Sequence, residues 1–362
     1  MKRVLSVVGA RPNFMKVAPI HRAFVEYGAG WEHSIVHTGQ HYDAAMSDAF
    51  FQDLDMPHPR WFLGVGSGSH AEQTAKVLTG FDAVCEESQP DYVIVVGDVN
   101  STVACALSSV KRGIRTAHVE AGLRSFDRAM PEEINRLATD AIVDDLFVTE
   151  PSAVQHLLRE GHAEGAIHFV GNTMIDSLMY ALPKASVSPI LDTLSVSPKN
   201  YALVTMHRPS NVDSAEQLTM IFSLLDEIAL SVPVVFPVHP RTRKNIETLG
   251  IRPRSSITLC EPVGYVDFLA LMKNASYVLT DSGGIQEETT ALGVPCITAR
   301  TTTERPITVE QGTNILVPPS REALLRAIAG LNKRDFGAAR VPELWDGHAA
   351  ERIVQFIIKH YS

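Results

Sequence analysis

The sequence predicts an α/β protein of two similar domains, each with a parallel sheet that helices cover on both faces. Short runs rich in Val and Ile alternate with helical patterns along the chain, which is the rhythm of consecutive β–α–β units. The strand-like runs are almost continuously apolar, as in Tyr92–Val96, which is typical of strands buried on both faces. The rhythm stops at about residues 183–200 and then restarts, which indicates two domains.

Residues 1–182 are expected to form the first domain. Nearly every strand-like run in this part is followed by a helical pattern, so the connections are crossovers between parallel strands. We expect strands at 4–8, 34–37, 92–96, 116–119, 146–148 and 167–170, and helices at about 15–27, 43–54, 72–87, 102–111, 135–142 and 152–160.

Residues 183–345 are expected to form the second domain, because the stretch 183–200 contains three prolines and four serines with little periodicity. A last helix within 346–362 is expected to pack back across the domain junction. The carboxyl ends of both sets of strands would face an interdomain cleft, where open α/β sheets bind ligands. In this domain we expect strands at 201–206, 234–238, 257–259, 277–280, 295–298 and 315–317, and helices at about 215–230, 242–249, 265–273, 285–292 and 321–331.

Composition argues against several classes of function. A formal net charge of −9 over 362 residues argues against a nucleic-acid partner held by general electrostatics. No apolar run approaches membrane-spanning length, and the first residues enter a strand rather than a signal sequence. Cys85, Cys105, Cys260 and Cys296 are scattered, so we expect buried thiols, no metal site and a cytoplasmic protein.

A glycine pair after the run Tyr277–Thr280 is the strongest candidate for an anion site. The sequence there is Asp-Ser-Gly-Gly-Ile-Gln-Glu-Glu (281–288). Glycines let backbone N–H groups approach a ligand, and the start of the following helix suits a phosphate. Ser282 would add a hydroxyl, and Glu288 would hold the paired hydroxyls of a sugar. The alternative is an ordinary turn that caps a helix.

Polar residues also follow the predicted strands of the first half. Arg11 and Lys16 come after the first strand, and cations at a helix start oppose the helix dipole unless an anion is near. Asp98 follows the strand at 92–96, where a role in the cleft and a capping role are both open. Glu120 ends the next strand, and a buried carboxylate there must be paired or used.

The remaining candidates divide between the two halves. Glu132 belongs to a helix start, where an acid is stabilising without any further role. His207 with Arg208, and then His239, follow two strands of the second half, and Arg305 lies in a later loop. This distribution suggests that the second half holds a phosphorylated leaving group while acids of the first half transfer protons.

Ten short motifs, spread over nearly the whole chain, are highly specific as a set. They are Gly-Ala-Arg-Pro-Asn-Phe (9–14), Thr-Gly-Gln-His (38–41), Gly-Asp-Val-Asn-Ser-Thr (97–102), His-Val-Glu-Ala-Gly-Leu-Arg (118–124), Met-Pro-Glu-Glu-Ile-Asn-Arg (130–136), Gly-Asn-Thr (171–173), His-Arg (207–208), Pro-Val-His-Pro (237–240), Asp-Ser-Gly-Gly-Ile-Gln-Glu-Glu (281–288) and Thr-Thr-Glu-Arg-Pro (302–306). In sequence and order they resemble the motifs of the non-hydrolysing UDP-N-acetylglucosamine 2-epimerases.

The resemblance implies a GT-B-like pair of Rossmann-like domains and reversible C2 epimerisation of UDP-GlcNAc to UDP-ManNAc. In that reaction UDP is eliminated to leave a 2-acetamidoglucal and is then added back, without a nicotinamide cofactor or an obligatory metal. Protonation of C2 from either face needs acid/base groups on both sides of the sugar. Charge on the departing phosphate needs cations.

The resemblance also assigns roles, position by position. Asp98, Glu120, Glu132 and His207 match catalytic residues. The positions that match substrate- or UDP-binding residues are Arg11, Lys16, Arg136, Phe268, Ser282, Gly283, Gly284, Glu288 and Arg305. Gln40, Arg208 and His239 match parts of a site where some bacterial members bind a second UDP-GlcNAc as an activator.

Departures from the family pattern leave alternatives open. Pro209-Ser210 stand where many bacterial members have Arg-Glu, and Asp43 stands where a second glutamine is usual, so activation by substrate stays open. Thr-Glu-Arg-Pro (303–306) favours the GlcNAc enzyme over a 2-epimerase of a UDP-diacetamido-uronic acid. More distant alternatives are a GT-B glycosyltransferase, a hydrolysing epimerase and a UDP-sugar-binding regulator. The family implies a homodimer that serves polysaccharide biosynthesis.

Overall fold

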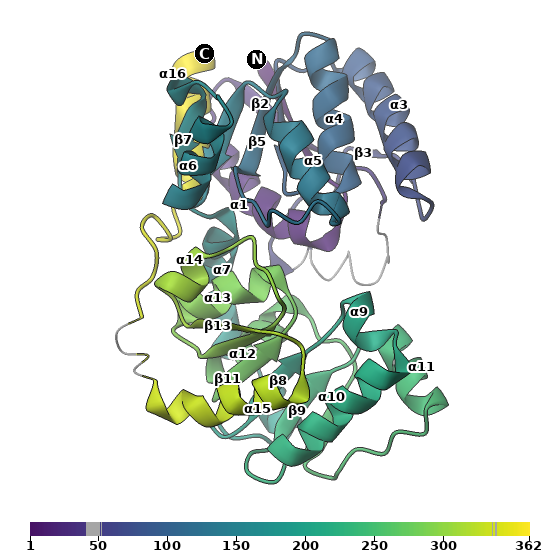
Figure 1. The fold of residues 1–362 in the computed structure, drawn as a ribbon. Coiled ribbons are helices and arrows are strands. Elements are labelled where there is room, and N and C mark those ends of the chain that lie inside the picture. Colours follow the sequence, from purple (N-terminus) through teal and green to yellow (C-terminus); the bar gives the residue numbers. More distant parts are fainter. Residues whose placement is uncertain (41–50, 52, 335, 337–338) are drawn as a thin grey trace. The chain divides into compact units, whose positions relative to one another are not determined.

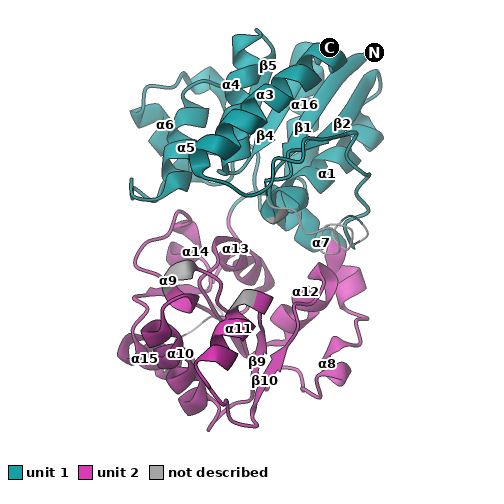
Figure 2. Cartoon of the chain, turned by 90° about the vertical axis from the view of Figure 1, so that its right-hand side faces the viewer, with its two compact units in different colours: residues 1–180, 343–362 teal, residues 181–342 magenta. Residues whose placement is uncertain are grey.

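The computed structural model describes residues 1–40, 51, 53–334, 336 and 339–362 (Figure 1). The chain divides into two compact units, which Figure 2 shows in different colours. The first unit consists of residues 1–180 and 343–362, and the second consists of residues 181–342. The chain therefore leaves the first unit once and returns to it for the last helix.

The first unit contains a seven-stranded sheet whose pairs are all parallel. The strand order is β3-β2-β1-β4-β5-β6-β7. The strands are β1 (Lys2–Val8), β2 (Trp31–His37), β3 (Trp61–Phe62), β4 (Tyr92–Val96), β5 (Arg115–Ala121), β6 (Asp145–Val148) and β7 (Ile167–Phe169).

Helices cover both faces of this sheet. Val93 and Val95 of β4 belong to one apolar cluster with Val77, Phe81 and Ala104 of the helices on that face. The residues of β4 that alternate with them are also fully buried, so the other face is covered as well. The helices of this unit are α1 (Arg11–Tyr27), α3 (His70–Ser88), α4 (Asn100–Lys111), α5 (Pro131–Asp140), α6 (Pro151–Arg159), η1 (Glu164–Ala166), α7 (Thr173–Ala185), which runs on into the second unit, and α16 (Ala349–Tyr361).

The second unit contains a six-stranded parallel sheet with the order β10-β9-β8-β11-β12-β13. Its strands are β8 (Ala202–Thr205), β9 (Val234–Pro237), β10 (Ile257–Cys260), β11 (Tyr277–Thr280), β12 (Cys296–Ala299) and β13 (Asn314–Val317). Its helical segments are α8 (Ile190–Thr193), α9 (Pro209–Val212), α10 (Ala215–Ile228), α11 (Pro240–Thr248), α12 (Tyr265–Asn274), α13 (Gly283–Leu292), α14 (Ile307–Glu310), α15 (Arg321–Gly330) and η2 (Leu331–Lys333).

Both sheets have the same kind of switch in strand order. In the first unit β1 lies between β2 and β4, and in the second unit β8 lies between β9 and β11. In the first unit the chain adds strands on one side of β1 and then on the other, and in the second unit it does the same around β8. The loops that follow β1 and β4, and those that follow β8 and β11, therefore lead in opposite directions. Open α/β sheets bind their ligands there, at the carboxyl ends of the strands.

The predicted fold class, two α/β units with parallel sheets, is confirmed. Some element bounds differ: α1 and α5 begin at residues 11 and 131, not at 15 and 135. Each has a proline in its first turn, where proline favours a helix start. The short elements β3, α8, α9 and α14 were not predicted, because two to four residues carry no periodicity. Most of the helix predicted at 43–54 lies outside the described residues.

The C-terminal helix α16 packs against α1. Asp176 of α7 accepts hydrogen bonds from the N–H groups of Ala349 (3.1 Å) and Ala350 (2.7 Å) at the start of α16. Burial raises the pKa of Asp176 to about 6, against the effect of these two hydrogen bonds. These two hydrogen bonds join α7 to the start of α16, so Asp176 fixes the returning chain to the first unit.

Among the described residues, no helix combines the length and the apolar composition that a bilayer crossing requires. The four cysteines carry free thiols, three of them buried and Cys260 half-buried. Burial raises the pKa of the Cys85 thiol to about 12 and that of the Cys296 thiol to about 11. These two thiols are therefore poor nucleophiles.

Candidate functional site

Glu120 lies in a bulge near the end of β5. The register between β5 and β6 shifts between Val119 and Ala121, and Glu120 has a φ of 76°, so the strict alternation assumed from the sequence stops at Val119. A non-glycine residue in this left-handed region is strained by about 1–3 kcal/mol. Such strain persists only where the surroundings hold it, which is a common property of functional sites.

Lys16 of α1 forms a buried ion pair with Glu120, between its Nζ and the Oε2 of the glutamate. Both side chains are less than a tenth exposed. Gly97 lies against this pair: a Cβ at that position would lie 3.0 Å from Lys16 Nζ and 3.5 Å from Glu120 Oε2, so the lysine end would have to shift slightly. A buried charge must be paired, so the lysine stabilises negative charge on Glu120.

Asp98 follows β4, the strand next to β5, and pairs with a different cation. The Arg136 guanidinium of α5 binds Asp98 Oδ2 and also lies 2.7 Å from Glu133 Oε2. The Asp98 side chain remains 29 % exposed, whereas that of Arg136 is buried. Asn135 donates to the Asp98 carbonyl oxygen at 2.9 Å. Helix α5 therefore fixes both the backbone and the carboxylate of Asp98.

Glu133 anchors the start of α5, whereas the sequence analysis predicted a functional role for the neighbouring Glu132. Its carboxylate accepts hydrogen bonds from the N–H of Ser125 (2.9 Å) and of Phe126 (3.0 Å). Burial works to raise the pKa of Glu133, but Ser125 and Arg136 outweigh it and hold the pKa below its usual range. Glu132, the nominated residue, is half-buried. Glu133 positions Arg136, and Glu132 has greater access to solvent.

Gln40 and Arg11 are further predicted site residues of the first unit, the first after β2 and the second at the start of α1. Gln40 is buried, and its Oε1 accepts hydrogen bonds from the N–H (3.1 Å) and Oγ (2.8 Å) of Ser101 at the start of α4. The side chain of Arg11 lies outside the described part of the structure, and so does Asp43. Lys16, which was predicted to bind the nucleotide, contacts Glu120, which was predicted to be a catalytic acid.

In the second unit, Asp281 joins the end of β11 to the end of β8. The carboxylate is fully buried and accepts from the N–H groups of His207 (3.1 Å) and Arg208 (2.9 Å) and from Asn211 Nδ2 (2.9 Å). The ring Nδ1 of His207 lies 2.9 Å from Asp281 Oδ1. Burial works to raise the pKa of Asp281, but His207 and Asn211 hold it below its usual range.

The glycine pair forms the start of α13, with Ser282 as the N-cap residue in an extended conformation. At Gly283 a Cβ would lie 2.7 Å from Arg305 Nη1 and 2.7 Å from Glu304 Oε1. A side chain at residue 283 would therefore displace the ends of Arg305 and Glu304 from their present positions at this helix start. The arrangement places N–H donors and a guanidinium together, as an anion site requires.

Acidic residues hold Arg305 in place. Its Nε lies 2.9 Å from Glu287 Oε2, and its Nη1 donates to Glu304 Oε1. Burial works to raise the pKa of Glu304, but Arg305 and Arg300 keep it far below its usual range. Glu304 is thus a carboxylate that fixes two guanidinium groups.

The other nominated residues of the second unit have different surroundings. Glu288 is buried in α13 and accepts a hydrogen bond from Tyr265 Oη at 2.9 Å. Phe268, one turn further along α12, is half-buried. Arg208 Nε donates to the Asp281 carbonyl oxygen at 3.2 Å, and His239, which follows β9, is exposed. The structure thus brings His207, Arg208 and the α13 start together through Asp281.

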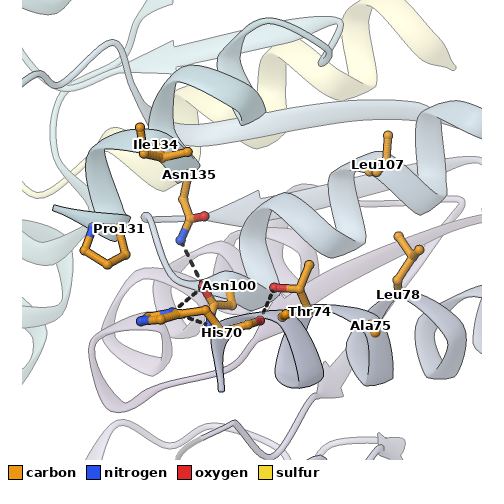
Figure 3. Close-up of a pocket in the computed structure, with 10 residues that line it drawn as sticks. His70, Thr74, Ala75, Leu78, Asn100, Leu107, Pro131, Ile134 and Asn135 are labelled. Carbon is orange, nitrogen blue, oxygen red and sulfur yellow. Dashed lines mark hydrogen bonds between the residues drawn. The ribbon is translucent and has the colours of Figure 1, made fainter. Parts of the chain in front are cut away.

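A pocket of about 570 Å³ lies between α3, α4 and α5. Figure 3 shows Asn100 between His70 and Asn135 at its polar end. Asn100 Nδ2 is 3.0 Å from His70 Nδ1, and Asn135 Nδ2 is 3.3 Å from Asn100 Oδ1. The other walls are mainly apolar, with Leu78 and Ile134 among them. The predicted catalytic residues are not among its lining residues, but Asn135, which lines it, also holds the Asp98 carbonyl oxygen.

Sequence reasoning missed the residues that hold others in place, chiefly Asp281, Glu133 and Glu304. Asp281 and Glu133 each adjoin a predicted site residue in a quoted motif. For Asp281 the available signal was a carboxylate directly after the apolar run Tyr277–Thr280, whereas Glu133 stands in a polar segment. The sequence placed both acids at a helix start, but which of the two is buried depends on contacts with Ser125 and Phe126, which local patterns do not show.

The comparisons with known proteins agree with this architecture. The family model described as "UDP-N-acetylglucosamine 2-epimerase" matches residues 25–358. The UDP-N-acetylglucosamine 2-epimerase of Methanocaldococcus jannaschii is 42 % identical over 97 % of both chains. The UDP-2,3-diacetamido-2,3-dideoxy-D-glucuronate 2-epimerase of Pseudomonas aeruginosa is 39 % identical over 99 % of both chains.

A solved structure is similarly close. The crystal structure of Methanocaldococcus jannaschii UDP-GlcNAc 2-epimerase in complex with UDP-GlcNAc and UDP matches with a TM-score of 0.91 and 42 % identity. The match covers 99 % of this chain and 100 % of that chain. These likenesses, together with the two parallel sheets, define a GT-B-like isomerase of nucleotide sugars. The chain belongs to the UDP-N-acetylglucosamine 2-epimerase family. The resemblance inferred from the motifs is confirmed.

Proposed function

We propose that this protein interconverts UDP-GlcNAc and UDP-ManNAc by eliminating UDP to a 2-acetamidoglucal and adding it back. The observation that carries the proposal is the pairing of two acids with two separate cations at neighbouring strand ends. Glu120 of β5 pairs with Lys16, and Asp98 after β4 pairs with Arg136. Abstraction of a weakly acidic C2 proton needs carboxylates that are held in place, and protonation from the other face needs a second group.

The first unit carries the proton transfers in this proposal. Asp98, Glu120 and Glu132 supply acid/base groups, and Lys16 and Arg136 keep two of them negatively charged in the resting enzyme. The partial exposure of Asp98 suits a group that exchanges protons with solvent. Return of the proton to the opposite face of C2 gives the epimer.

The second unit carries the nucleotide. The N–H groups at the start of α13, with Ser282, Gly283 and Gly284, bind the diphosphate, and Arg305 adds positive charge. His207, held through Nδ1 by Asp281, lies beside the diphosphate and stabilises the charge that develops as the C1–O bond breaks. Glu288 binds the ribose hydroxyls, and Phe268 packs near the uracil.

Several finer features of the proposal follow from the family. The enzyme works as a cytoplasmic homodimer without a nicotinamide cofactor or an obligatory metal, and its product feeds polysaccharide biosynthesis. Gln40, Arg208 and His239 form part of a site for a second UDP-sugar. The assignment of Gln40 to this site has the least support, because its amide oxygen already accepts a hydrogen bond from Ser101.

A second candidate substrate is a UDP-diacetamido-uronic acid. It is supported by the Pseudomonas aeruginosa relative, which is 39 % identical over 99 % of both chains. The same elimination chemistry would serve it, because the reacting C1–C2 unit is common to both sugars.

Product analysis tests the proposal. The protein is incubated separately with UDP-GlcNAc, UDP-ManNAc and the diacetamido-uronate analogue, and the sugar nucleotides are separated and quantified. We expect the first two reactions to converge on one mixture of UDP-GlcNAc and UDP-ManNAc. Release of free ManNAc and UDP as end products would indicate a hydrolysing epimerase. Conversion of the uronate analogue alone would transfer the proposal to that substrate.

A further inference from the structure

His118 lies in β5 two residues before Glu120, and its side chain is fully buried. Its Nε2 lies 2.7 Å from the Gly97 carbonyl oxygen, and its Nδ1 lies 2.6 Å from Asp140 Oδ1. Because a carbonyl oxygen only accepts hydrogen bonds, Nε2 is the donor to Gly97. His118 therefore ties the residue before Asp98 to the last residue of α5.

Asp140 extends this connection to the other side of Glu120. Its Oδ2 accepts a hydrogen bond from the N–H of Gly122 at 3.0 Å and lies 2.7 Å from Arg124 Nη2. Arg124 in turn lies 2.6 Å from Glu160 Oε2. Burial works to raise the pKa of Asp140, but His118 and Arg124 hold it below its usual range. Asp140 is thus a buried carboxylate with all of its bonds directed to β5 and the segment after it.

The held backbone surrounds a strained residue. Glu120 has a φ of 76°, which is strained for a residue with a side chain. Gly97 and Gly122 also have positive φ values, of 68° and 77°, which glycine adopts without strain. A Cβ at Gly122 would lie 2.6 Å from the Ala153 carbonyl oxygen, so this turn also packs tightly against α6. His118 bonds to the backbone of Gly97, which follows β4 and precedes Asp98. Asp140 bonds to the backbone of Gly122, which follows the bulge at Glu120.

We propose that Asp140 and His118 are positioning residues that hold Asp98 and Glu120 in the geometry needed for proton transfer at C2. This proposal rests on the proposed epimerase function. Neither residue contacts substrate in this account, and both act through the backbone at Gly97 and Gly122. Their loss should therefore lower kcat and leave UDP binding, which we assign to the second unit, unchanged.

The main test compares two buried aspartates of the same unit. Asp145 begins β6 and is held by Tyr92 Oη at 2.7 Å and Tyr361 Oη at 2.8 Å, so Asp145→Asn disturbs a similar buried network away from the carboxyl ends of the strands. We expect Asp140→Asn to lower kcat for C2 exchange by about 10-fold or more, with KM and the Kd for UDP unchanged. Asp145→Asn should lower Tm and leave kcat unchanged.

A second pair of variants keeps the test decisive if Asp140→Asn does not fold. In His118→Gln the amide nitrogen retains a donor for the Gly97 carbonyl, whereas His118→Met has a side chain of similar length without a donor. We expect His118→Gln to retain clearly more of the wild-type kcat than His118→Met.

The outcomes separate the two proposals. Full kcat in folded Asp140→Asn, an equal fall in Asp145→Asn, or equal kcat in the two His118 variants would overturn the positioning role, even if the wild-type protein is an active epimerase. A wild-type protein that exchanges no C2 proton of either candidate sugar would instead contradict the proposed function, and the positioning role with it.

Discussion

His207 and Asp281 are joined at two points: the ring Nδ1 of His207 lies 2.9 Å, and its backbone N–H nitrogen 3.1 Å, from Asp281 Oδ1. The histidine side chain is 58 % exposed and the aspartate side chain is fully buried. A buried carboxylate thus fixes both the backbone and the ring of an exposed residue. Because Asp281 lies two residues before α13, it fixes the position of His207 relative to the glycine pair at the start of that helix.

Asp281→Asn should therefore uncouple His207 from the α13 start. An amide of the same shape cannot accept all the hydrogen bonds that this carboxylate receives. We expect kcat to fall by about 10-fold or more, the range of one lost charge-assisted hydrogen bond. Steady-state kinetics measure the fall, with Asp226→Asn, a substitution of a half-buried aspartate of α10, as the matched control. An unchanged kcat in Asp281→Asn would show that His207 needs no such partner.

Asp98→Asn and Glu120→Gln should abolish C2 exchange while the affinity for UDP stays nearly intact. Each substitution removes the basic form of a proposed acid/base group, and such groups contribute about 10²–10⁴-fold to a rate. Exchange is followed by NMR and UDP binding by calorimetry. Loss of UDP binding in both variants would contradict the assignment of the nucleotide to the second unit.

Lys16→Met should behave like an acid/base variant rather than like a nucleotide-binding variant. The lysine contacts Glu120 in the first unit, and its removal leaves a buried glutamate unpaired. We expect a fall in kcat of about 10²-fold, the effect of roughly 3 kcal/mol, with little change in the Kd for UDP. Lys16→Arg, which keeps the charge, is the control. A weaker UDP affinity with unchanged kcat would restore the nucleotide-contacting role that the sequence suggested.

Arg305→Gln should weaken UDP binding. A charge-assisted hydrogen bond to a phosphate contributes about 1.5–3 kcal/mol, or about 10- to 100-fold in Kd. Arg321→Gln, which removes an exposed ion pair with Glu227, is the control for general effects of charge. Because Arg305 also pairs with Glu287 and Glu304, Tm is measured in parallel. A folded Arg305→Gln variant with wild-type UDP affinity would contradict the assigned role.

Asp176→Asn should remove a pH dependence of stability. Folding raises the pKa of Asp176 to about 6, so the folded state binds its proton more tightly than the unfolded state does. The stability from this group is complete below about pH 4, its unfolded pKa, and is lost as the pH rises through 6. Relative to the variant, the wild-type protein should lose about 2 kcal/mol of unfolding free energy between pH 4 and pH 7. Urea denaturation at both pH values measures it, and parallel curves would refute it.

The sequence was sufficient to predict the two parallel sheets, because strands that are buried on both faces have continuous apolar sequences such as Tyr92–Val96. It also placed most of the predicted site residues at the carboxyl ends of strands. Asp98 and Glu120, for example, follow or end the neighbouring strands β4 and β5. These predictions depended on local patterns and on motif identity. The family followed from motifs spread over the whole chain.

The partners within the site could not be predicted in the same way. The bulge at Glu120 depends on contacts with β6 and α5, which are distant in the sequence. Lys16 pairs with Glu120 beside Gly97, which belongs to a third segment and leaves close contact space for the lysine end. Glu133 and not Glu132 is buried because its carboxylate is held by the N–H groups of Ser125 and Phe126 and by Arg136. Each of these facts is a property of tertiary packing.

Deuterium incorporation shows whether the proton at C2 leaves the sugar during the reaction. The wild-type protein is incubated with UDP-GlcNAc in deuterated water, and the recovered sugar nucleotides are examined by proton NMR. If protons are removed and returned at C2 by Asp98, Glu120 and Glu132, deuterium will appear at C2 of both UDP-GlcNAc and UDP-ManNAc. Formation of UDP-ManNAc with the C2 proton fully retained would contradict the account, because elimination and re-addition must pass through loss of that proton.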